Sequence, residues 1–278
     1  MRIAICGDDF GMNDAVDRGM VELAGAGRLG GVGCLTQGPS FARRAGELGR
    51  LDVELGVHLD LADAVPGAGA LPALVARCYL GAVDRERVRQ ALRAQFDAFE
   101  RTFGRAPDYV DGHRHIHQLP QVRDSLFELL QRRYANDPPA LRCTRPGVLA
   151  GTPWRHRAKA GVIAALGARP CAAAAAARGW TMNRRMLGVY DFRGGERTYL
   201  RLLQGWLRRA REGDLLLCHP AAFAQEGDAL GAQRLAEFRV LASDALPLLL
   251  ETYGLRIAGL KALGRPAGRL GYTCGIAP

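Results

Sequence analysis

The feature of this sequence that most constrains its fold is an alternation of short apolar runs with longer amphipathic runs. The short runs are typical of strands, and the longer runs repeat their apolar residues at helical spacing. From the amino terminus, strands are predicted over residues 2–7, 31–35 and 53–59, separated by helices over 13–26 and 41–48. This order indicates a parallel sheet, because each helix returns the chain to the start of the next strand.

The alternation continues almost to the end of the chain. Further strands are predicted over residues 109–111, 141–144, 214–219 and 255–260, and further helices over 71–81, 85–103, 121–134, 158–168, 197–211 and 230–252. Proline- and glycine-rich stretches at 65–72, 135–139 and 146–153 are typical of connections, and the alanine run at 171–177 is typical of a helical packing face. With 278 residues and neither an internal repeat nor a clear linker, we expect one α/β domain over 1–278, a barrel or partial barrel.

The charge of the chain bears on its partners. The formal net charge is +10, yet the only lysines are Lys159 and Lys261, and the arginines are spread over the sequence at helix-like spacing. Nucleic-acid binding usually requires clustered cations, so this pattern favours solvated helix faces and no nucleic-acid partner. Weak attraction to acidic surfaces or anionic membranes stays open.

The cysteines and the apolar runs bear on the compartment. The seven cysteines are odd in number and form no C-x-x-C pair, so they do not indicate disulfides. The first apolar run reaches Asp8 without the long core of a signal peptide, and no run is long enough to span a membrane. We therefore expect a cytoplasmic protein.

Histidines collect in short motifs at the ends of predicted strands. Five of the six occur as His58, as His113, His115 and His117, and as His219. A fourth strand end carries the adjacent carboxylates Asp8 and Asp9. Sites in parallel α/β folds gather at the carboxyl ends of strands, so these motifs are expected to meet in one crevice.

The pair Asp8 and Asp9 is difficult to explain structurally. A helix N-cap accounts for one aspartate but not for two, whereas a cation-binding carboxylate beside a general base accounts for both. A lone histidine such as His58 is more often a hydrogen-bonded core residue than a ligand, and the other motifs favour the ligand. Three histidines at a spacing of two, from His113 to His117, would point to one side of an extended segment; the alternative is a polar loop.

One aspartate and two imidazoles form a plausible set of protein ligands for a catalytic ion. Their mixed nitrogen and oxygen atoms favour Zn²⁺, Co²⁺, Ni²⁺ or Mn²⁺ over Mg²⁺ or Ca²⁺. His219, which precedes Pro220, is either a structural histidine or the general acid of a hydrolase.

Together these motifs resemble those of the YdjC-like carbohydrate deacetylases, the ChbG/HpnK group, over most of the chain. The matching segments are Asp8-Asp9-Phe10-Gly11, Gly56-Val57-His58-Leu59, Val110-Asp111-Gly112-His113-Arg114-His115-Ile116-His117 with Pro120, and Cys218-His219-Pro220. The chain departs from the usual pattern at Cys6-Gly7 and at Ala221, which puts substrate preference in doubt and not the metal site.

The resemblance implies a single-domain, irregular TIM-like (β/α) barrel similar to NodB-type deacetylases. It also implies the site. Asp9, His58 and His113 would bind one divalent ion, with Zn²⁺ expected first and Mg²⁺, Co²⁺, Ni²⁺ or Mn²⁺ as alternatives. Asp8 would be the general base and His219 the general acid. The groups near the substrate would be His115, His117 and Arg145, with Asp111 orienting an imidazole.

The expected reaction is hydrolysis of the N-acetyl group of an N-acetylated sugar or glycoconjugate, with release of acetate. Two alternatives stay open: a metal-dependent phosphoesterase, which would usually carry more carboxylate ligands and two ions, and a catalytically silent sugar-binding homologue. By analogy with the family, a homodimer is plausible.

Overall fold

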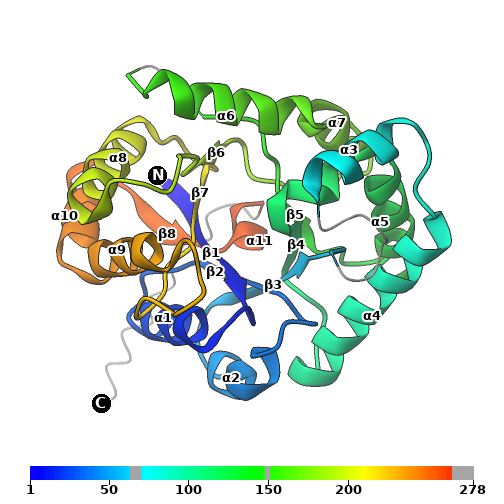
Figure 1. Ribbon diagram of the computed structural model, residues 1–278, viewed down its shortest axis with the longest axis horizontal. Coiled ribbons are helices and arrows are strands. Elements are labelled where there is room, and N and C mark those ends of the chain that lie inside the picture. The colour runs from blue at the N-terminus through cyan, green and yellow to red at the C-terminus, as the bar shows by residue number, and fades with distance from the viewer. Residues whose placement is uncertain (63–69, 148–150, 265–278) are drawn as a thin grey trace, which may run out of the picture.

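The structure is a computed structural model that describes residues 1–62, 70–147 and 151–264 (Figure 1). Most of the predicted connection at 65–72 and part of that at 146–153 lie outside the described residues, as does Cys274. The strands are β1 (Arg2–Phe10), β2 (Gly31–Cys34), β3 (Glu54–Leu59), β4 (Tyr109–Gly112), β5 (Ala140–Leu141), β6 (Met186–Leu187), β7 (Leu215–Cys218) and β8 (Arg256–Ala258).

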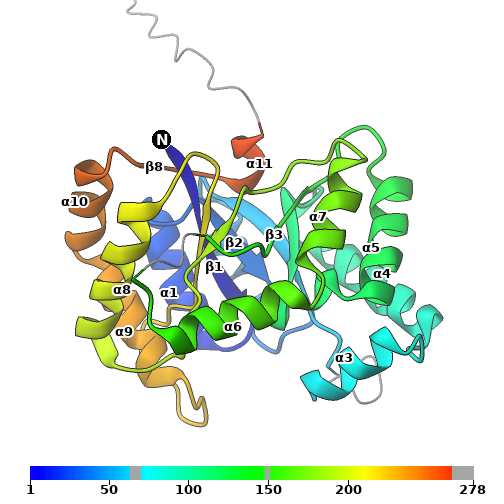
Figure 2. The same cartoon turned by 90° about the horizontal axis from the view of Figure 1, so that it is seen from above.

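Helices surround these strands on the outside, except α11, which lies at the end of the barrel where β1 begins (Figures 1 and 2). They are α1 (Asp14–Gly25), α2 (Phe41–Leu48), α3 (Leu71–Tyr79), α4 (Arg85–Phe103), α5 (Pro120–Arg133), α6 (Trp154–Ala165), α7 (Ala168–Ala176), α8 (Gly195–Arg209), α9 (Gly231–Ala242), α10 (Ala245–Thr252) and α11 (Leu260–Leu263), with a 3-10 segment η1 (His113–Gln118). The Asn13 side chain caps α1 by accepting a hydrogen bond from the Val16 amide at 2.9 Å.

All eight strands belong to one parallel sheet in the order β5-β4-β3-β2-β1-β7-β6, with β8 also paired to β1. The sheet curls, and two isolated parallel bridges, from Leu141 to Met182 and from Pro146 to Met186, connect its two edges. The predicted α/β fold, an irregular barrel of parallel strands, is confirmed.

Strand β1 lies within the sheet, between β2 and β7, and brings its carboxyl end to the crevice. From Ile3 to Phe10 every residue is buried, because β2 and β7 flank the strand on both sides. A strand covered in this way reads as a continuous apolar run rather than an alternating one. Its two carboxylates, Asp8 and Asp9, are therefore held inside the protein at the strand end.

Several predicted elements differ from the structure. The prediction of a single helix over 230–252 is wrong. Ser243 is extended, at ψ 170°, and separates α9 from α10. Pro247 explains the break, because a proline ring clashes with the carbonyl of the residue four before it and suits only the first turn of a new helix. The strand predicted over 141–144 overlaps β5 only at Leu141, and β6 was not predicted.

The extended segment predicted over 113–117 is also wrong. η1 coils there, and Arg114 and His115 adopt left-handed backbone conformations, with φ of 52° and 61°. The three histidines consequently do not share one face. Helix 158–168 corresponds to α6, shifted toward the amino terminus, and the alanine run forms α7, which buries Ala172 and Ala175 as expected of a packing face.

Two further features of the described residues concern the cysteines and the helices. The six cysteines within the described residues are all buried and free. In the same part of the chain, no helix combines the length and the apolar character needed to cross a bilayer.

Candidate active site

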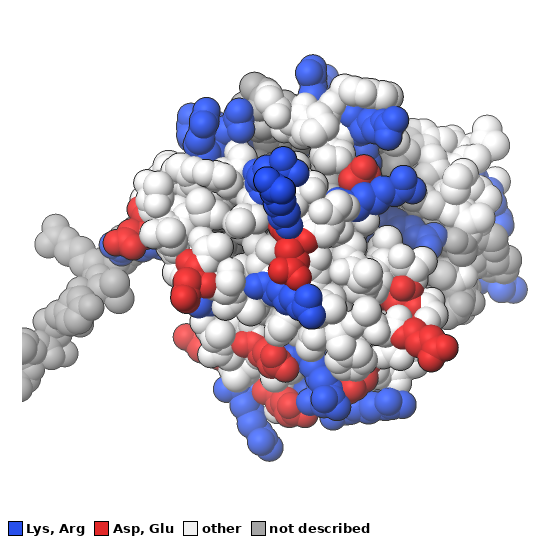
Figure 3. All heavy atoms as spheres, turned by 60° about the vertical axis from the view of Figure 1, so that its left-hand side comes forward, with Lys and Arg blue, Asp and Glu red and all other residues white. Residues whose placement is uncertain are grey.

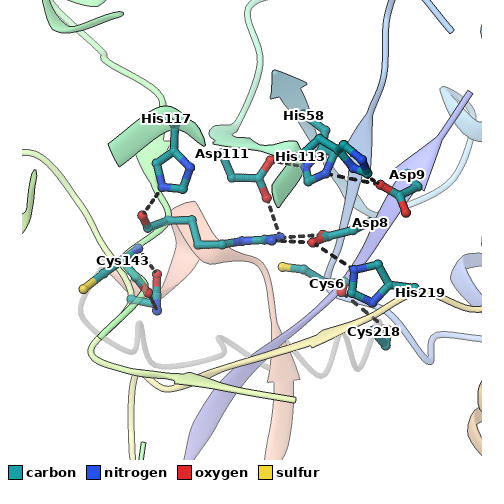
Figure 4. A network of polar contacts seen from close by, with 12 residues as sticks. Cys6, Asp8, Asp9, His58, Asp111, His113, His117, Cys143, Cys218 and His219 are labelled. Atoms are coloured by element: carbon teal, nitrogen blue, oxygen red, sulfur yellow. Dashed lines mark hydrogen bonds and ion pairs between the residues drawn. The ribbon is translucent and has the colours of Figure 1, made fainter. Parts of the chain in front are cut away.

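The chain turns sharply at the end of β1, and this turn separates its two carboxylates. Asp9 has a left-handed φ of 79°, and Gly11 follows at 98°. A non-glycine residue in that region is strained, typically by about 1–3 kcal/mol, and persists only where its surroundings hold it. Figure 4 shows the result: Asp8 points to one set of partners and Asp9 to another.

Asp9 meets two imidazoles. Its Oδ1 atom lies 2.9 Å from Nδ1 of His113 and 3.4 Å from Nε2 of His58. The ligand atoms of these three residues all lie within 4.8 Å of one another. Burial would raise the pKa of Asp9, but hydrogen bonds with His113 and His58 outweigh it and hold that pKa well below its usual value. Asp9 is therefore an anion.

Asp111 orients His58 from behind. Its Oδ1 atom lies 2.6 Å from Nδ1 of His58, so the opposite ring nitrogen, Nε2, faces Asp9. Burial lowers the pKa of His58, yet the charges of Asp111 and Asp8 outweigh burial and raise it well above its usual value. A carboxylate behind an imidazole is a common arrangement around metal-binding histidines, because it fixes the tautomer and the ring.

Arg142 links the carboxylates of Asp8 and Asp111. The fully buried guanidinium donates to both oxygens of Asp8, at 2.5 and 2.6 Å, and lies 2.5 Å from Oδ2 of Asp111. Burial opposes ionisation of Asp111, but the Arg142 charge overcomes it and lowers the pKa of Asp111 to about 2. The sequence analysis did not identify this arginine.

Arg142 also distinguishes two possible metal clusters. Asp8, His58 and Asp111 form a second group of potential ligands. In that group the two carboxylates already neutralise a guanidinium, and Nδ1 of His58 is bound to Asp111. In the group of Asp9, His58 and His113, a guanidinium, that of Arg234, holds only Oδ2 of Asp9. Oδ1 of Asp9 and Nε2 of His58 still face each other, so this donor set fits a divalent cation better.

His219 enters the site from the end of β7. Its Nε2 atom lies 4.0 Å from Oδ2 of Asp8, beyond hydrogen-bond length, and its ring packs edge-on against Phe192 at 5.0 Å. Burial, although opposed by Asp9 and Asp8, lowers the pKa of His219 to about 4, so the ring is neutral at pH 7.

Helix α9 supplies two further ionisable groups that were not predicted from the sequence. Arg234 donates to Oδ2 of Asp9 at 2.8 Å. Glu237 accepts hydrogen bonds from the backbone amide of His219 at 2.7 Å and from the hydroxyl of Tyr190 at 2.6 Å. Both lie in a helix whose sequence shows no motif; their spacing of three residues, on one helix face, is the only signal that could have found them.

The remaining predicted site residues separate. His115 lies with Asp8, Asp9, His58, His113 and His219 along one pocket of about 540 Å³. His117 is buried behind the pocket, where Nε2 lies 3.0 Å from the Arg142 carbonyl oxygen. Burial lowers the pKa of His117 to about 4, so the neutral ring donates this bond. The structure does not bring Arg145 to the pocket: its guanidinium contacts Cys143 and the carbonyl of Arg184.

The pocket combines this polar end with an apolar wall. The wall contains aliphatic and aromatic side chains from α6 and from the segment after β6, namely Val162, Ile163, Leu166, Val189, Tyr190 and Phe192. Lys159 lies over the Phe192 ring, 4.7 Å from its centroid, and donates to the Tyr190 carbonyl at 2.7 Å.

Comparison with known proteins identifies a matching family model and several similar proteins. Residues 2–252 match the family model described as YdjC-like protein. A human protein named carbohydrate deacetylase is 33% identical over 151 residues, which are 47% of this chain and 46% of that protein. The matched part thus spans about half the length of this curated relative.

Solved structures show the same fold at low sequence identity. A protein of Enterococcus faecalis V583, named for cellobiose-phosphate cleavage, has a TM-score of 0.65 at 22% identity and covers 94% of this chain and 98% of its own. A peptidoglycan N-acetylglucosamine deacetylase has a TM-score of 0.54 at 11% identity and covers 94% of this chain and 87% of its own.

Proposed function

Because the chain belongs to the YdjC-like protein family, we propose that it hydrolyses the N-acetyl group of an N-acetylated amino sugar or glycoconjugate and releases acetate. The observation that carries this proposal is the shared position of two kinds of group in one pocket. A cluster suited to a divalent cation, Asp9, His58 and His113, adjoins two proton-transfer groups, Asp8 and His219.

We propose that Asp9, His58 and His113 hold one divalent ion, with Zn²⁺ first. The anionic Asp9 and the oriented Nε2 of His58 fit such an ion. When bound, the ion would polarise the acetyl carbonyl and increase the acidity of a water molecule. Asp111 keeps the His58 ring in place, and Arg234 holds the second oxygen of Asp9.

Asp8 acts as the general base in this proposal. Its carboxylate accepts the proton of the attacking water, while the two hydrogen bonds from Arg142 fix its direction. Arg142 thus takes the role near the catalytic residues that the resemblance suggested for an arginine of this segment, Arg145.

His219 acts as the general acid. The ring is neutral at rest, because burial lowers its pKa. It therefore receives its proton during turnover from Asp8, which has accepted the proton of the attacking water and whose Oδ2 lies 4.0 Å from Nε2 of His219. It then passes this proton to the departing amide nitrogen, and acetate and the free amino sugar leave. Glu237 positions His219 through its backbone amide, and His115 contacts the sugar from the pocket wall.

Two wider expectations belong to the same proposal. The chain acts as one domain over residues 1–278, in the cytoplasm, alone or as a homodimer. Limited proteolysis that produced two stable, independently folding fragments would contradict the single domain.

The test is acetate release from N,N′-diacetylchitobiose and from N-acetylglucosamine conjugates. Metal-stripped and Zn²⁺-reconstituted protein are compared with His113→Ala, and His156→Gln serves as a control histidine outside the pocket. We expect release that requires the ion, disappears in His113→Ala and persists in His156→Gln.

Metal content separates the alternatives. Two ions per chain, together with hydrolysis of p-nitrophenyl phosphate, would favour a phosphoesterase. One tightly bound ion without release from any acetylated sugar would contradict the deacetylase proposal.

A further inference from the structure

One long segment of the chain carries no negative charge. Residues 138–190 contain neither aspartate nor glutamate, although they contain eight arginines and one lysine, within a chain whose net charge is +10. The segment includes α6 and α7 and ends at Asp191. Most of the excess positive charge of the protein therefore belongs to one continuous part of the fold.

Helix α6 exposes an apolar stripe within this segment. With about 100° of turn per residue, Trp154, Ala158, Gly161, Val162 and Ala165 fall within about 100° of one another. All five are exposed, Trp154 at 71% and Val162 at 61%. On the opposite side of the helix, His156, Ala160 and Ile163 are buried against the protein.

Two arginines border the stripe. Arg155 and Arg157 lie on opposite flanks of it, and both are exposed. The Arg155 guanidinium stands over the Trp154 ring, 5.6 Å from its centroid. Asp191, an acidic residue that contacts the helix, pairs with His156 on the buried side at 3.1 Å. The exposed side therefore presents apolar groups between cations.

Helix α3 extends this surface. The Tyr79 hydroxyl donates to the Ala165 carbonyl at 3.5 Å, which places the end of α3 beside the end of α6. Tyr79 is 54% exposed and Leu80 is 81% exposed. We call the exposed parts of these helices the α3–α6 face. Figure 2 shows α3 and α6 along the edge of the molecule toward which β1 runs.

The face over α8, α9 and α10 is different. Figure 3 shows basic and acidic side chains interspersed there, as in the ion pair between Arg239 and Glu196 at 2.9 Å. This face also has an exposed apolar residue, Leu248 on α10, which is 63% exposed. Leu248 lies outside the acid-free segment 138–190. Exposed apolar residues between Arg155 and Arg157, in a segment of the chain without acidic residues, thus characterise the α6 part of the α3–α6 face.

We propose that the α3–α6 face docks onto an anionic phospholipid bilayer. A helix that lies in a membrane interface buries an apolar stripe that contains tryptophan among the acyl chains, while flanking arginines meet the lipid phosphates. A nucleic acid would match the arginines but not the stripe. A second copy would match the stripe, but it would bring Arg155 and Arg157 against the same cations.

Docking on this face has a consequence for the pocket. Val162, Ile163 and Leu166 of the α6 region line the pocket as well, so its entrance lies beside the docked surface. The docking proposal does not depend on the reaction catalysed, because it rests on residues outside the catalytic cluster. It therefore stands or fails separately from the deacetylase proposal.

The test measures sedimentation of the full chain with large unilamellar vesicles. Vesicles of phosphatidylcholine with 30% phosphatidylglycerol, about a third of the lipid, are compared with pure phosphatidylcholine. The variants are Arg155→Glu with Arg157→Glu, and Trp154→Ala. The matched control is Arg43→Glu with Arg50→Glu, which makes the same charge change at and after α2, on the opposite side of the molecule (Figure 1).

We expect binding only to the anionic vesicles. The Arg155 and Arg157 double variant should bind roughly 30-fold more weakly or worse, and Trp154→Ala roughly tenfold more weakly, while the control stays within about twofold of the unaltered protein. Circular dichroism checks that each variant is folded, and since all three altered side chains are exposed, folding should be retained.

Three results would overturn the proposal. One is equal loss of binding in the α6 variant and in the control, since net charge alone would then explain attraction. Another is unchanged binding in Trp154→Ala together with displacement by duplex DNA, which indicates a polyanion site. The third is no vesicle binding with a concentration-dependent dimer that Val162→Glu dissociates, which indicates a second copy as the occupant.

Discussion

Arg142 binds both oxygens of Asp8 through two separate guanidinium nitrogens, at 2.5 and 2.6 Å, and one of these nitrogens also lies 2.5 Å from Asp111. The proposed general base and the carboxylate that orients His58 are therefore linked through one buried cation. A substitution of Arg142 should therefore affect both the general base Asp8 and the orientation of His58 by Asp111.

Replacement of Arg142 by methionine should destabilise the protein by about 3–5 kcal/mol, because two buried carboxylates lose their counter-charge. Arg142→Lys keeps the charge but cannot reproduce the paired donors, so we expect smaller destabilisation and at least about tenfold lower kcat. Urea unfolding and acetate release measure the two effects. Arg133→Lys, at the ion pairs with Glu100 and Asp97, is the control; an equal loss of kcat there would contradict the prediction.

Asp111→Asn should weaken the binding of Zn²⁺ by about 10–100-fold, because Nδ1 of His58 loses its charged partner and Nε2 is no longer held toward Asp9. Competition with a chromogenic chelator measures the affinity. Asp137→Asn, at an exposed carboxylate (74%), should leave the affinity unchanged. Affinity that survives in Asp111→Asn would place the ion elsewhere.

Glu237 should make the stability of the protein fall as pH rises. Burial raises the pKa of this carboxyl from 4.5 to about 7. The folded protein keeps the proton up to pH 7, whereas the unfolded chain releases it near pH 4.5, so the unfolded state binds fewer protons between these values. The contribution to the free energy of unfolding is full below pH 4.5 and is lost by pH 7, a change on the order of 2–3 kcal/mol.

Thermal or urea unfolding at a series of pH values from 4.5 to 8 tests this dependence. In Glu237→Gln, the part of the fall in the free energy of unfolding that this carboxyl causes should disappear. An identical pH dependence in the variant would assign the effect to another group.

His115 should separate fold from substrate binding. Its φ of 61° is left-handed, which asparagine tolerates and a β-branched residue does not. We expect His115→Asn to keep its stability and bound Zn²⁺ while KM for the acetylated sugar rises several-fold. His115→Val should be about 1–2 kcal/mol less stable. If KM in His115→Asn equals that of the unaltered protein, His115 does not contact the substrate.

Much of the architecture follows from the sequence, because buried parallel strands leave clear apolar runs and helices leave clear periodicity. The convergence of Asp8, Asp9, His58, His113 and His219 follows from the same cause: each comes at or just beyond the end of a strand, and parallel strands end on one side. Site residues could therefore be predicted from the sequence where they lie at or just beyond the end of a strand.

Site residues could not be predicted from the sequence where tertiary contacts decide their position. Arg142 is one arginine among many in the sequence, and only its burial between Asp8 and Asp111 distinguishes it. The coil of η1 depends on left-handed residues, which alternating histidines do not reveal. Arg234 and Glu237 lie on a helix whose sequence shows only ordinary polar spacing, so their reach into the site depends on how α9 packs.

The pairing of β1 has a consequence for how the protein is made. This strand is synthesised first, yet its partners β7 and β8 belong to the other end of the chain, up to residue 258. At a translation rate of about 5–20 residues per second, β1 waits roughly 10–50 s for them. Through that interval an apolar strand that carries Asp8 and Asp9 near its end lacks these partners, and chaperones at the ribosome can bind it.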